Sequence, residues 1–151
     1  MKPSTKSSNF PDVNVWLALS YERHEHHLAA RSWLSSLSDY DSICFSRFTQ
    51  LGLLRLLTTE AIMGRNVMSQ KQAWDIYDAW INDDRVLLVE EAAGLEAIFR
   101  RLSQSPQPSS KSRADAYLAA FASAAAMNLV TFDRGFRGKL HDLVLLPASR
   151  N

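Results

Sequence analysis

DAYLAAFASAAAMNLVTFD, residues 115–133, is the stretch that decides the fold. Small and apolar residues over 114–127 predict a helix, and the run LVTF at 129–132 predicts a buried strand that ends at Asp133. The helix face that carries Asp115 is otherwise apolar, with Leu118, Ala119 and Ala122 at the spacing i, i+3, i+4 and i+7. Because such a face packs on a sheet, we expect the carboxylate of Asp115 to point inward.

Outward from this stretch, short apolar runs alternate with segments of helical spacing. The first run that predicts a strand ends at Asn9–Phe10. The others are Ser42–Ser46, Arg85–Val89 and Leu143–Leu146. The segments that predict helices are Val13–Leu19, His26–Leu37, Arg47–Thr58, Ser69–Asn82 and Ala92–Leu102. Continuous apolar strands separated by helices indicate a parallel sheet covered on both faces. We therefore predict the α/β class, as a three-layer α/β/α sandwich around a central, mainly parallel sheet.

The length and composition predict one globular domain. With 151 residues, of which 46% are hydrophobic and 22% charged, the chain is long enough to bury a core. We expect a single domain over 1–151, with 1–8 as a flexible N-terminal tail and Ser103–Ser112 as an exposed loop. The single cysteine, Cys44, excludes an internal disulfide, and the run Val13–Leu19 is too short to span a membrane. These features favour a cytoplasmic protein.

Three aspartates fall where a parallel α/β sheet forms its sites. Asp12 follows the first strand, Asp133 follows the strand at 129–132, and Asp115 lies in the first turn of the helix before that strand. Because sites in open α/β sheets form outside the carboxyl ends of the strands, we expect the three carboxylates to converge. Converging carboxylates repel one another without a cation, and oxygen ligands without His or Cys suit Mg²⁺ or Mn²⁺. Such an ion activates water and stabilises a phosphodiester under attack, so the pattern predicts phosphodiester hydrolysis.

Each aspartate also has a purely structural interpretation. Asp12 is well placed as an N-cap, Asp115 lies three residues after Ser112 as in a capping box, and Asp133 precedes a Gly-containing turn. For any one of them alone this interpretation is favoured. Only the convergence of all three at one edge of the sheet favours a metal site.

Two polar residues are predicted to support the carboxylates. Thr131 lies two residues before Asp133, so strand alternation places both side chains on one side. Asn14 lies two residues after Asp12. Side chains of this kind hold metal ligands in place by hydrogen bonds, although a β-branched residue in a strand is also ordinary.

Four blocks of the chain resemble a known family. PDVNVWLAL (Pro11–Leu19), SRFTQLGLLRLLT (Ser46–Thr58), DAYLAAFA (Asp115–Ala122) and VTFDRGF (Val130–Phe136) are similar to blocks of the PIN-domain toxins of VapC type. The resemblance implies a PIN fold, Mg²⁺- or Mn²⁺-dependent endoribonuclease activity, inhibition by a VapB-type antitoxin protein, and a homodimer. It also implies that the family's first aspartate is Asp12 and that the later two are Asp115 and Asp133.

The chain departs from the family pattern at Gln50. Many such toxins carry a glutamate at the start of the helix after the second strand, and Gln50 is predicted to occupy that position. It shares a stripe with Leu53, Leu54 and Leu57, so we expect it to face inward. Its amide offers an oxygen or a donor but no charge, which predicts weak binding of a second metal ion. The alternative is a packed, hydrogen-bonded glutamine without a role in the site.

RNA contacts are predicted to be local, because the net charge is only +1. Arg134 and Arg137 follow the last aspartate directly and are the predicted contacts to backbone phosphates. The cluster His24, His26 and His27 lies in a turn before a helix, and we predict no metal site there. The four tryptophans are predicted to pack in the core or in a dimer.

Two rival functions remain open on the residues alone. The first is a non-catalytic PIN module that binds RNA or a partner protein, in which Gln50 marks lost activity. The second is a flavodoxin-like receiver, whose acidic pocket accepts a phosphoryl group. The receiver is disfavoured because no lysine stands out at a comparable strand end.

Overall fold

A five-stranded parallel sheet forms the centre of the molecule. The structure is a computed structural model that describes residues 6–147. The strands are β1 (Ser8–Pro11), β2 (Ser42–Phe45), β3 (Val86–Leu88), β4 (Asn128–Thr131) and β5 (Leu143–Leu145), in the order β3-β2-β1-β4-β5. Every neighbouring pair is parallel. The predicted α/β class is confirmed, and the sheet is wholly rather than mainly parallel.

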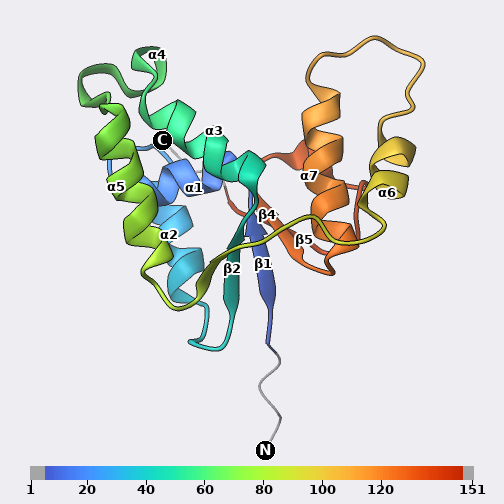
Figure 1. The fold of residues 1–151 in the computed structure, drawn as a ribbon, viewed down its shortest axis with the longest axis horizontal. Coiled ribbons are helices and arrows are strands. Elements are labelled where there is room, and N and C mark those ends of the chain that lie inside the picture. The colour runs from blue at the N-terminus through green and yellow to red at the C-terminus, as the bar shows by residue number, and fades with distance from the viewer. Residues whose placement is uncertain (1–5, 148–151) are drawn as a thin grey trace, which may run out of the picture.

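One face of the sheet is covered by the N-terminal helices (Figure 1). These are α1 (Val13–Ser20), α2 (His27–Ser35), α3 (Arg47–Leu57) and α5 (Gln70–Ile81), with the short α4 (Glu60–Met63) and the 3₁₀ turn η1 (Gly64–Asn66) between α3 and α5. The core on this side is built on Trp16, whose ring is fully buried and stacks on Phe45 at 3.7 Å between centroids. The large aromatic contact fixes α1 on the strand β2.

The other face carries α6 (Leu95–Leu102) and α7 (Ser112–Ala124), which lie side by side (Figure 1). The core of this layer includes Phe10 of β1, stacked on Phe121 of α7 at 4.6 Å. The predicted apolar stripe of α7 is buried, with Leu118, Ala119 and Ala122 each at most 3% exposed. The two helical layers and the sheet together form the predicted three-layer sandwich.

Several predicted boundaries are wrong. Helix α7 begins at Ser112 and ends at Ala124, so the exposed loop after α6 covers 103–111. No element was predicted where α4 and η1 lie, because four- and three-residue turns leave almost no periodicity. Ser8 begins β1, and the carbonyl of Ser7 accepts a hydrogen bond from the Ser42 amide, so the predicted tail does not extend to residue 8. The rest of that tail, residues 1–5, lies outside the described residues.

The strand order places a topological switch point between β1 and β4. The chain moves from β1 to β2 and β3 on one side, and then crosses to β4 and β5 on the other. Such a switch point is where ligands bind in open α/β sheets. The order differs from the 2-1-3-4-5 order of flavodoxin-like receivers, so the receiver interpretation is wrong. Within residues 6–147, the helices are all too short or too polar to cross a bilayer.

Candidate active site at the carboxyl edge of the sheet

Asp12 lies between the end of β1 and the start of α1. Its backbone amide donates to the Val130 carbonyl at 2.8 Å, which continues the β1–β4 ladder past the strand end. Its side chain caps α1, because Oδ1 accepts the Val13 amide at 2.6 Å. The predicted capping role therefore exists. It uses one carboxylate oxygen and leaves the other to Thr131.

Thr131, the last residue of β4, joins two of the predicted site residues. Its fully buried hydroxyl donates to Asp12 Oδ2 at 3.0 Å and accepts the Asp133 amide at 3.0 Å. Since the backbone amide must donate, the single hydroxyl proton goes to Asp12. Thr131 thus holds the Asp12 carboxylate by a charge-assisted hydrogen bond.

Asp133 and Asp115 reach the same crevice from the other two segments. Asp133 caps the 3₁₀ turn η2 (Arg134–Phe136), where its Oδ1 accepts the Gly135 amide at 2.8 Å. Asp115 lies in the first turn of α7, half-buried. The predicted capping box with Ser112 does not form, because α7 begins at Ser112 and its N-cap, Lys111, makes no side-chain cap hydrogen bond. The structure therefore supports capping roles for Asp12 and Asp133 but not for Asp115.

The three carboxylates lie close enough for their charges to affect the pKa of Asp12 and of Asp115. Burial raises the pKa of Asp12, and the negative charges of Asp115 and Asp133 add to the rise, against the hydrogen bonds from Thr131 and Val13. Burial also raises the pKa of Asp115, with a further rise from Asp133. Each raised pKa means that the folded protein disfavours the ionised carboxylate. A bound cation would remove that penalty.

Basic residues follow the last aspartate, as predicted. The charge of Lys139 opposes the rise in the Asp115 pKa, and its ammonium lies 5.6 Å from the centre of the Phe136 ring. Arg134 and Arg137 are exposed on η2 and just after it, with side chains in solvent. Lys139, which belongs to the same predicted basic set as Arg134 and Arg137, is a cation whose charge acts on a site carboxylate.

Gln50 and Asn14 are the two remaining residues that were predicted to support the aspartates. Gln50 is 3% exposed, as predicted for its stripe, and its Oε1 accepts from Arg47 Nη1 at 2.6 Å. Burial raises the pKa of Tyr77 in α5, and the Gln50 side chain and the Arg47 charge oppose that rise, so both lie beside Tyr77. Asn14 is exposed and lines a separate pocket of about 450 Å³. Within residues 6–147, neither side chain makes a hydrogen bond to an aspartate.

Helix α3 approaches the start of α1 at another residue. A Cβ on Gly52 would lie 2.7 Å from Val13 Cγ2, closer than real side-chain contacts allow. Gly52 of α3 therefore faces Val13, the residue after Asp12, where a larger side chain would not fit. No pattern in the sequence indicates this contact, because packing between two helices depends on their crossing and not on either periodicity alone.

The His cluster and Cys44 make structural contacts, and the tryptophans differ in burial. The His26 ring packs on Phe132 at 4.7 Å, and His27 Nδ1 lies 2.7 Å from the Ala18 carbonyl oxygen. Cys44 is buried, and burial raises the pKa of its thiol. Trp16 is a core residue, whereas Trp74 is 46% exposed on α5 and does not pack in the core.

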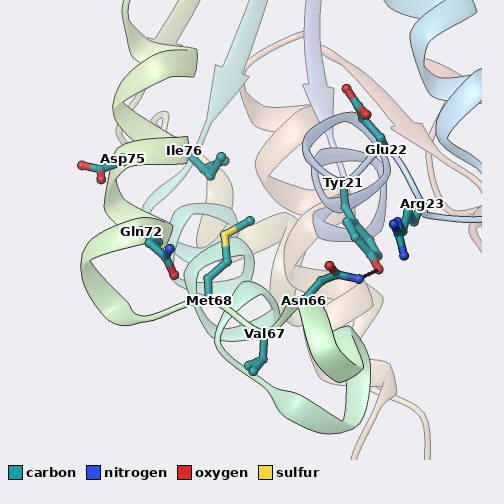
Figure 2. A pocket seen from close by; sticks show the side chains of 9 residues that line it. All are labelled: Tyr21, Glu22, Arg23, Asn66, Val67, Met68, Gln72, Asp75 and Ile76. Carbon is teal, nitrogen blue, oxygen red and sulfur yellow. Dashed lines mark hydrogen bonds between the residues drawn. The ribbon is translucent and has the colours of Figure 1, made fainter.

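A pocket of about 620 Å³ lies away from the aspartates, between the turn after α1, η1 and α5 (Figure 2). Asn66 Nδ2 donates to Tyr21 Oη at 2.9 Å across one end of it. Its charged side chains are Glu22 and Arg23 from the turn after α1 and Asp75 from α5. None of the site aspartates lines this pocket, so it is not part of the candidate active site.

The donor set fits a hard divalent ion held partly through water. The available groups are carboxylate oxygens, which Mg²⁺ and Mn²⁺ prefer. Over the part of the chain that is described, no three His, Cys, Asp or Glu side chains are gathered tightly enough to hold an ion together. Mg²⁺ usually keeps several waters and takes only one or two protein carboxylates, so a looser arrangement suits it.

The fold and this acidic crevice define a PIN domain, and the chain belongs to the PIN-domain family, whose model matches residues 10–139. It is similar to Ribonuclease VapC41 of Mycobacterium tuberculosis, with 42% identity over 129 residues, covering 83% of this chain and 88% of that protein. The protein is therefore a PIN-domain protein of VapC type, as the sequence blocks predicted.

Solved structures share the fold. The structure of VapBC2 from Rickettsia felis, bound to a DNA fragment from its promoter, matches with a TM-score of 0.67 and 16% identity, over 93% of this chain and 99% of that chain. VapC20 of Mycobacterium tuberculosis, a toxin that cleaves the sarcin-ricin loop, matches with a TM-score of 0.63 and 19% identity, over 85% and 92% of the two chains. At these identities the likeness establishes the fold alone.

Proposed function

We propose that this protein is a metal-dependent endoribonuclease of VapC type, the toxin of a toxin–antitoxin pair, in which Asp12, Asp115 and Asp133 hold Mg²⁺ or Mn²⁺. The observation that carries the proposal is the mutual charge effect of the three carboxylates at the β1–β4 switch point. The 42% identity to a protein named a ribonuclease supports the reaction. The proposed substrate is RNA, and the bond broken is a phosphodiester.

The divalent ion, when bound, acidifies a water and neutralises charge on the phosphodiester. The chain's own residues prepare the crevice for this chemistry. The hydroxyl of Thr131 and the Val13 amide fix the two oxygens of Asp12. One of the three aspartates also accepts a hydrogen bond from the attacking water and orients it for in-line displacement. Arg134 and Arg137 contact the flanking phosphates of the RNA.

The proposed partner is a VapB-type antitoxin protein, since solved relatives of the same fold are VapBC complexes. We propose that the toxin forms a homodimer and acts in the cytoplasm, where its RNA substrate is found. A neutralising partner is consistent with an enzyme whose substrate is abundant.

A second candidate function is a non-catalytic PIN module that binds RNA or a partner protein. It is favoured by one observation, the lack of three tightly gathered ligands among residues 6–147. Gln50 does not favour it, because Gln50 is bonded to Arg47 and, within residues 6–147, makes no hydrogen bond to an aspartate. Cleavage measurements distinguish the two functions.

The test is cleavage of total cellular RNA by the full-length protein with Mg²⁺, with Mn²⁺ or with EDTA. The wild type is compared with Asp12→Asn and Asp115→Asn. Asparagine still caps a helix but is a poorer metal ligand, so the substitutions remove ligation and keep local structure. We expect each variant to lose at least about 100-fold in rate, the size of a lost catalytic proton acceptor.

Asp75→Asn is the matched control, because Asp75 lies exposed on α5 and pairs only with Lys71. It should cleave at the wild-type rate. Wild-type rates in both site variants would refute the assignment of the aspartates. A wild type that is inert with either ion would establish the binding module instead.

A further inference from the structure

Another pocket lies at the carboxyl edge of the sheet, and we call it the α3–α7 pocket. It has a volume of about 520 Å³, and the residues that line it include Arg47, Leu88, Glu90, Glu91, Tyr117 and Phe121. Arg47 is the first residue of α3, directly after β2, and the two glutamates follow β3. The pocket therefore lies at the same carboxyl edge of the sheet as the aspartates.

The distance between the two sites is short. Strand β2 is the neighbour of β1, and parallel strands lie about 5 Å apart, so the ends of β2 and β3 are roughly 5–10 Å from the end of β1. Tyr117 follows Asp115 by two residues on α7 and therefore faces a different direction. A single RNA strand that crosses the aspartates would therefore bring its neighbouring nucleotide within reach of this pocket.

Arg47 is held in the pocket by an uncharged partner. Its Nη1 donates to Gln50 Oε1 at 2.6 Å, and Gln50 is anchored in the core. Since the amide is neutral, the guanidinium keeps its full charge. Among the described residues, the Nε and Nη2 groups of Arg47 have no hydrogen-bond partner. These two groups form the side of the guanidinium that binds two acceptors at once.

Aromatic rings and a fixed carboxylate complete the pocket. Tyr117 Oη donates to Glu91 Oε1 at 2.6 Å, which holds an otherwise exposed glutamate against α7. The Tyr117 ring also contacts Phe48 at 5.5 Å and Phe99 at 5.7 Å between centroids. Burial raises the pKa of Tyr117, as does the charge of Glu91, so its hydroxyl stays protonated and keeps donating.

The charge balance of the pocket favours a base over a phosphate. Its charged side chains are one guanidinium and two carboxylates, which together repel an anion. A nucleobase is neutral, stacks on aromatic rings and presents both donors and acceptors. We propose that the α3–α7 pocket binds a guanine base of the RNA, next to the phosphodiester that is cut. The inference rests on the proposed ribonuclease function.

Among the four bases, guanine can form the most hydrogen bonds with the guanidinium and the carboxylates of this pocket. Its O6 and N7 accept two hydrogen bonds from one arginine. Its N1–H and N2–H are adjacent donors that match the two oxygens of a carboxylate such as that of Glu90, and the free oxygen of Glu91 can accept one of them. Adenine and cytosine offer a carboxylate only an exocyclic amino group, and uracil only one ring N–H. The expected order of affinity is therefore guanine first and uracil last.

The test is an NMR titration of the full-length protein, in EDTA, with the 5′-monophosphates of guanosine, adenosine, cytidine and uridine. The phosphate is common to all four, so a difference in affinity comes from the base. We expect guanosine monophosphate to bind at least about fivefold more tightly than the others, with shifts at Tyr117 and Glu91. Arg47→Gln and Glu91→Gln should each remove most of that preference.

Arg55→Gln and Glu96→Gln are the matched controls, because these residues lie exposed on α3 and α6, outside the pocket. They should keep the guanine preference. Equal affinity for the four nucleotides, no saturable binding, or a preference that survives both pocket substitutions would overturn the proposal.

The titration contains no divalent metal and measures no cleavage, so it separates this inference from the proposed function. A guanine preference in a protein that cuts no RNA would support the pocket and refute the nuclease. If the protein cuts RNA, oligonucleotides that differ only beside the cut should be cleaved faster with guanine there. Cleavage that ignores that base would refute the pocket and leave the nuclease intact.

Discussion

Over β1 and β4 the carboxyl edge of the sheet carries aspartates, whereas over β2 and β3 it carries a guanidinium bonded to an amide, beside two glutamates. The first half contains Asp12 and Asp133, joined through the hydroxyl of Thr131. The second contains Arg47, bonded to Gln50. Both halves follow strands of one parallel sheet, so the sheet alone does not decide the chemistry.

The difference teaches what Gln50 does in this chain. A glutamate at position 50 would form an ion pair with Arg47 and cancel its charge. The glutamine instead orients Arg47 and leaves that charge for a ligand. If the α3–α7 pocket binds a base as proposed, the missing carboxylate acts in the second half of the edge, where it changes which group is bound.

The largest expected difference between the halves comes from two buried threonines. Thr131 and Thr49 are both fully buried with bonded hydroxyls, but Thr49 bonds only to Ser46 in the capping box of α3. We expect Thr131→Val and Thr49→Val each to lower the free energy of unfolding by about 1–3 kcal/mol. Only Thr131→Val should also slow RNA cleavage, by about 10–100-fold, because the Asp12 carboxylate then loses the hydrogen bond that holds it in place.

Urea denaturation and cleavage rates of folded protein check this pair. If both variants lose cleavage to the same degree, the loss is a general effect of instability and the two halves do not differ. Equal rates for Thr131→Val and the wild type would show that Asp12 needs no support from the strand.

The pH dependence of stability should differ in sign between two aspartates. The pKa of Asp12 is raised, so in metal-free protein its contribution to stability is full at acid pH and is lost as pH rises through that pKa. Asp12→Asn should therefore raise the melting temperature at pH 7.5 and change it little at pH 3.5. Mg²⁺ should stabilise the wild type more than this variant.

Asp83, at the opposite edge before β3, is the matched comparison. Hydrogen bonds and the charge of Arg85 lower its pKa, so its contribution is present above the ordinary carboxyl pKa and is lost as pH falls through the lowered value. Asp83→Asn should thus lower the melting temperature at pH 7.5. The same sign of change at pH 7.5 for both variants would contradict the electrostatic description of the carboxylate half.

The smallest expected effect concerns RNA affinity beside the carboxylates. If Arg134 and Arg137 each contact one phosphate, replacing both with Gln should flatten the plot of log affinity against log salt by about 1.4 for single-stranded RNA. Filter binding in EDTA at several salt concentrations measures this slope. The control, Arg100→Gln with Arg101→Gln at exposed positions of α6, should leave the slope unchanged. An unchanged slope in the variant that lacks Arg134 and Arg137 would refute their phosphate contacts.

The sequence by itself determined the layers and the position of the aspartates. The apolar run before Asp133 and the stripe that begins at Asp115 are local patterns, and local patterns fix strands, helices and their inward faces. The α/β class follows from them, and so does the expectation that Asp12 and Asp133 leave the sheet at the same edge. The family blocks follow from the same residues.

Only the tertiary structure decided which side chains meet. It gave Thr131 both Asp12 and Asp133 as partners, turned Gln50 toward Arg47, and placed Gly52 against Val13. It also brought Glu91 to Tyr117 across 26 residues of sequence, which formed a pocket that no periodicity indicates. The physical reason is that periodicity fixes the face on which a residue lies, whereas a contact also depends on the crossing of elements far apart in the chain.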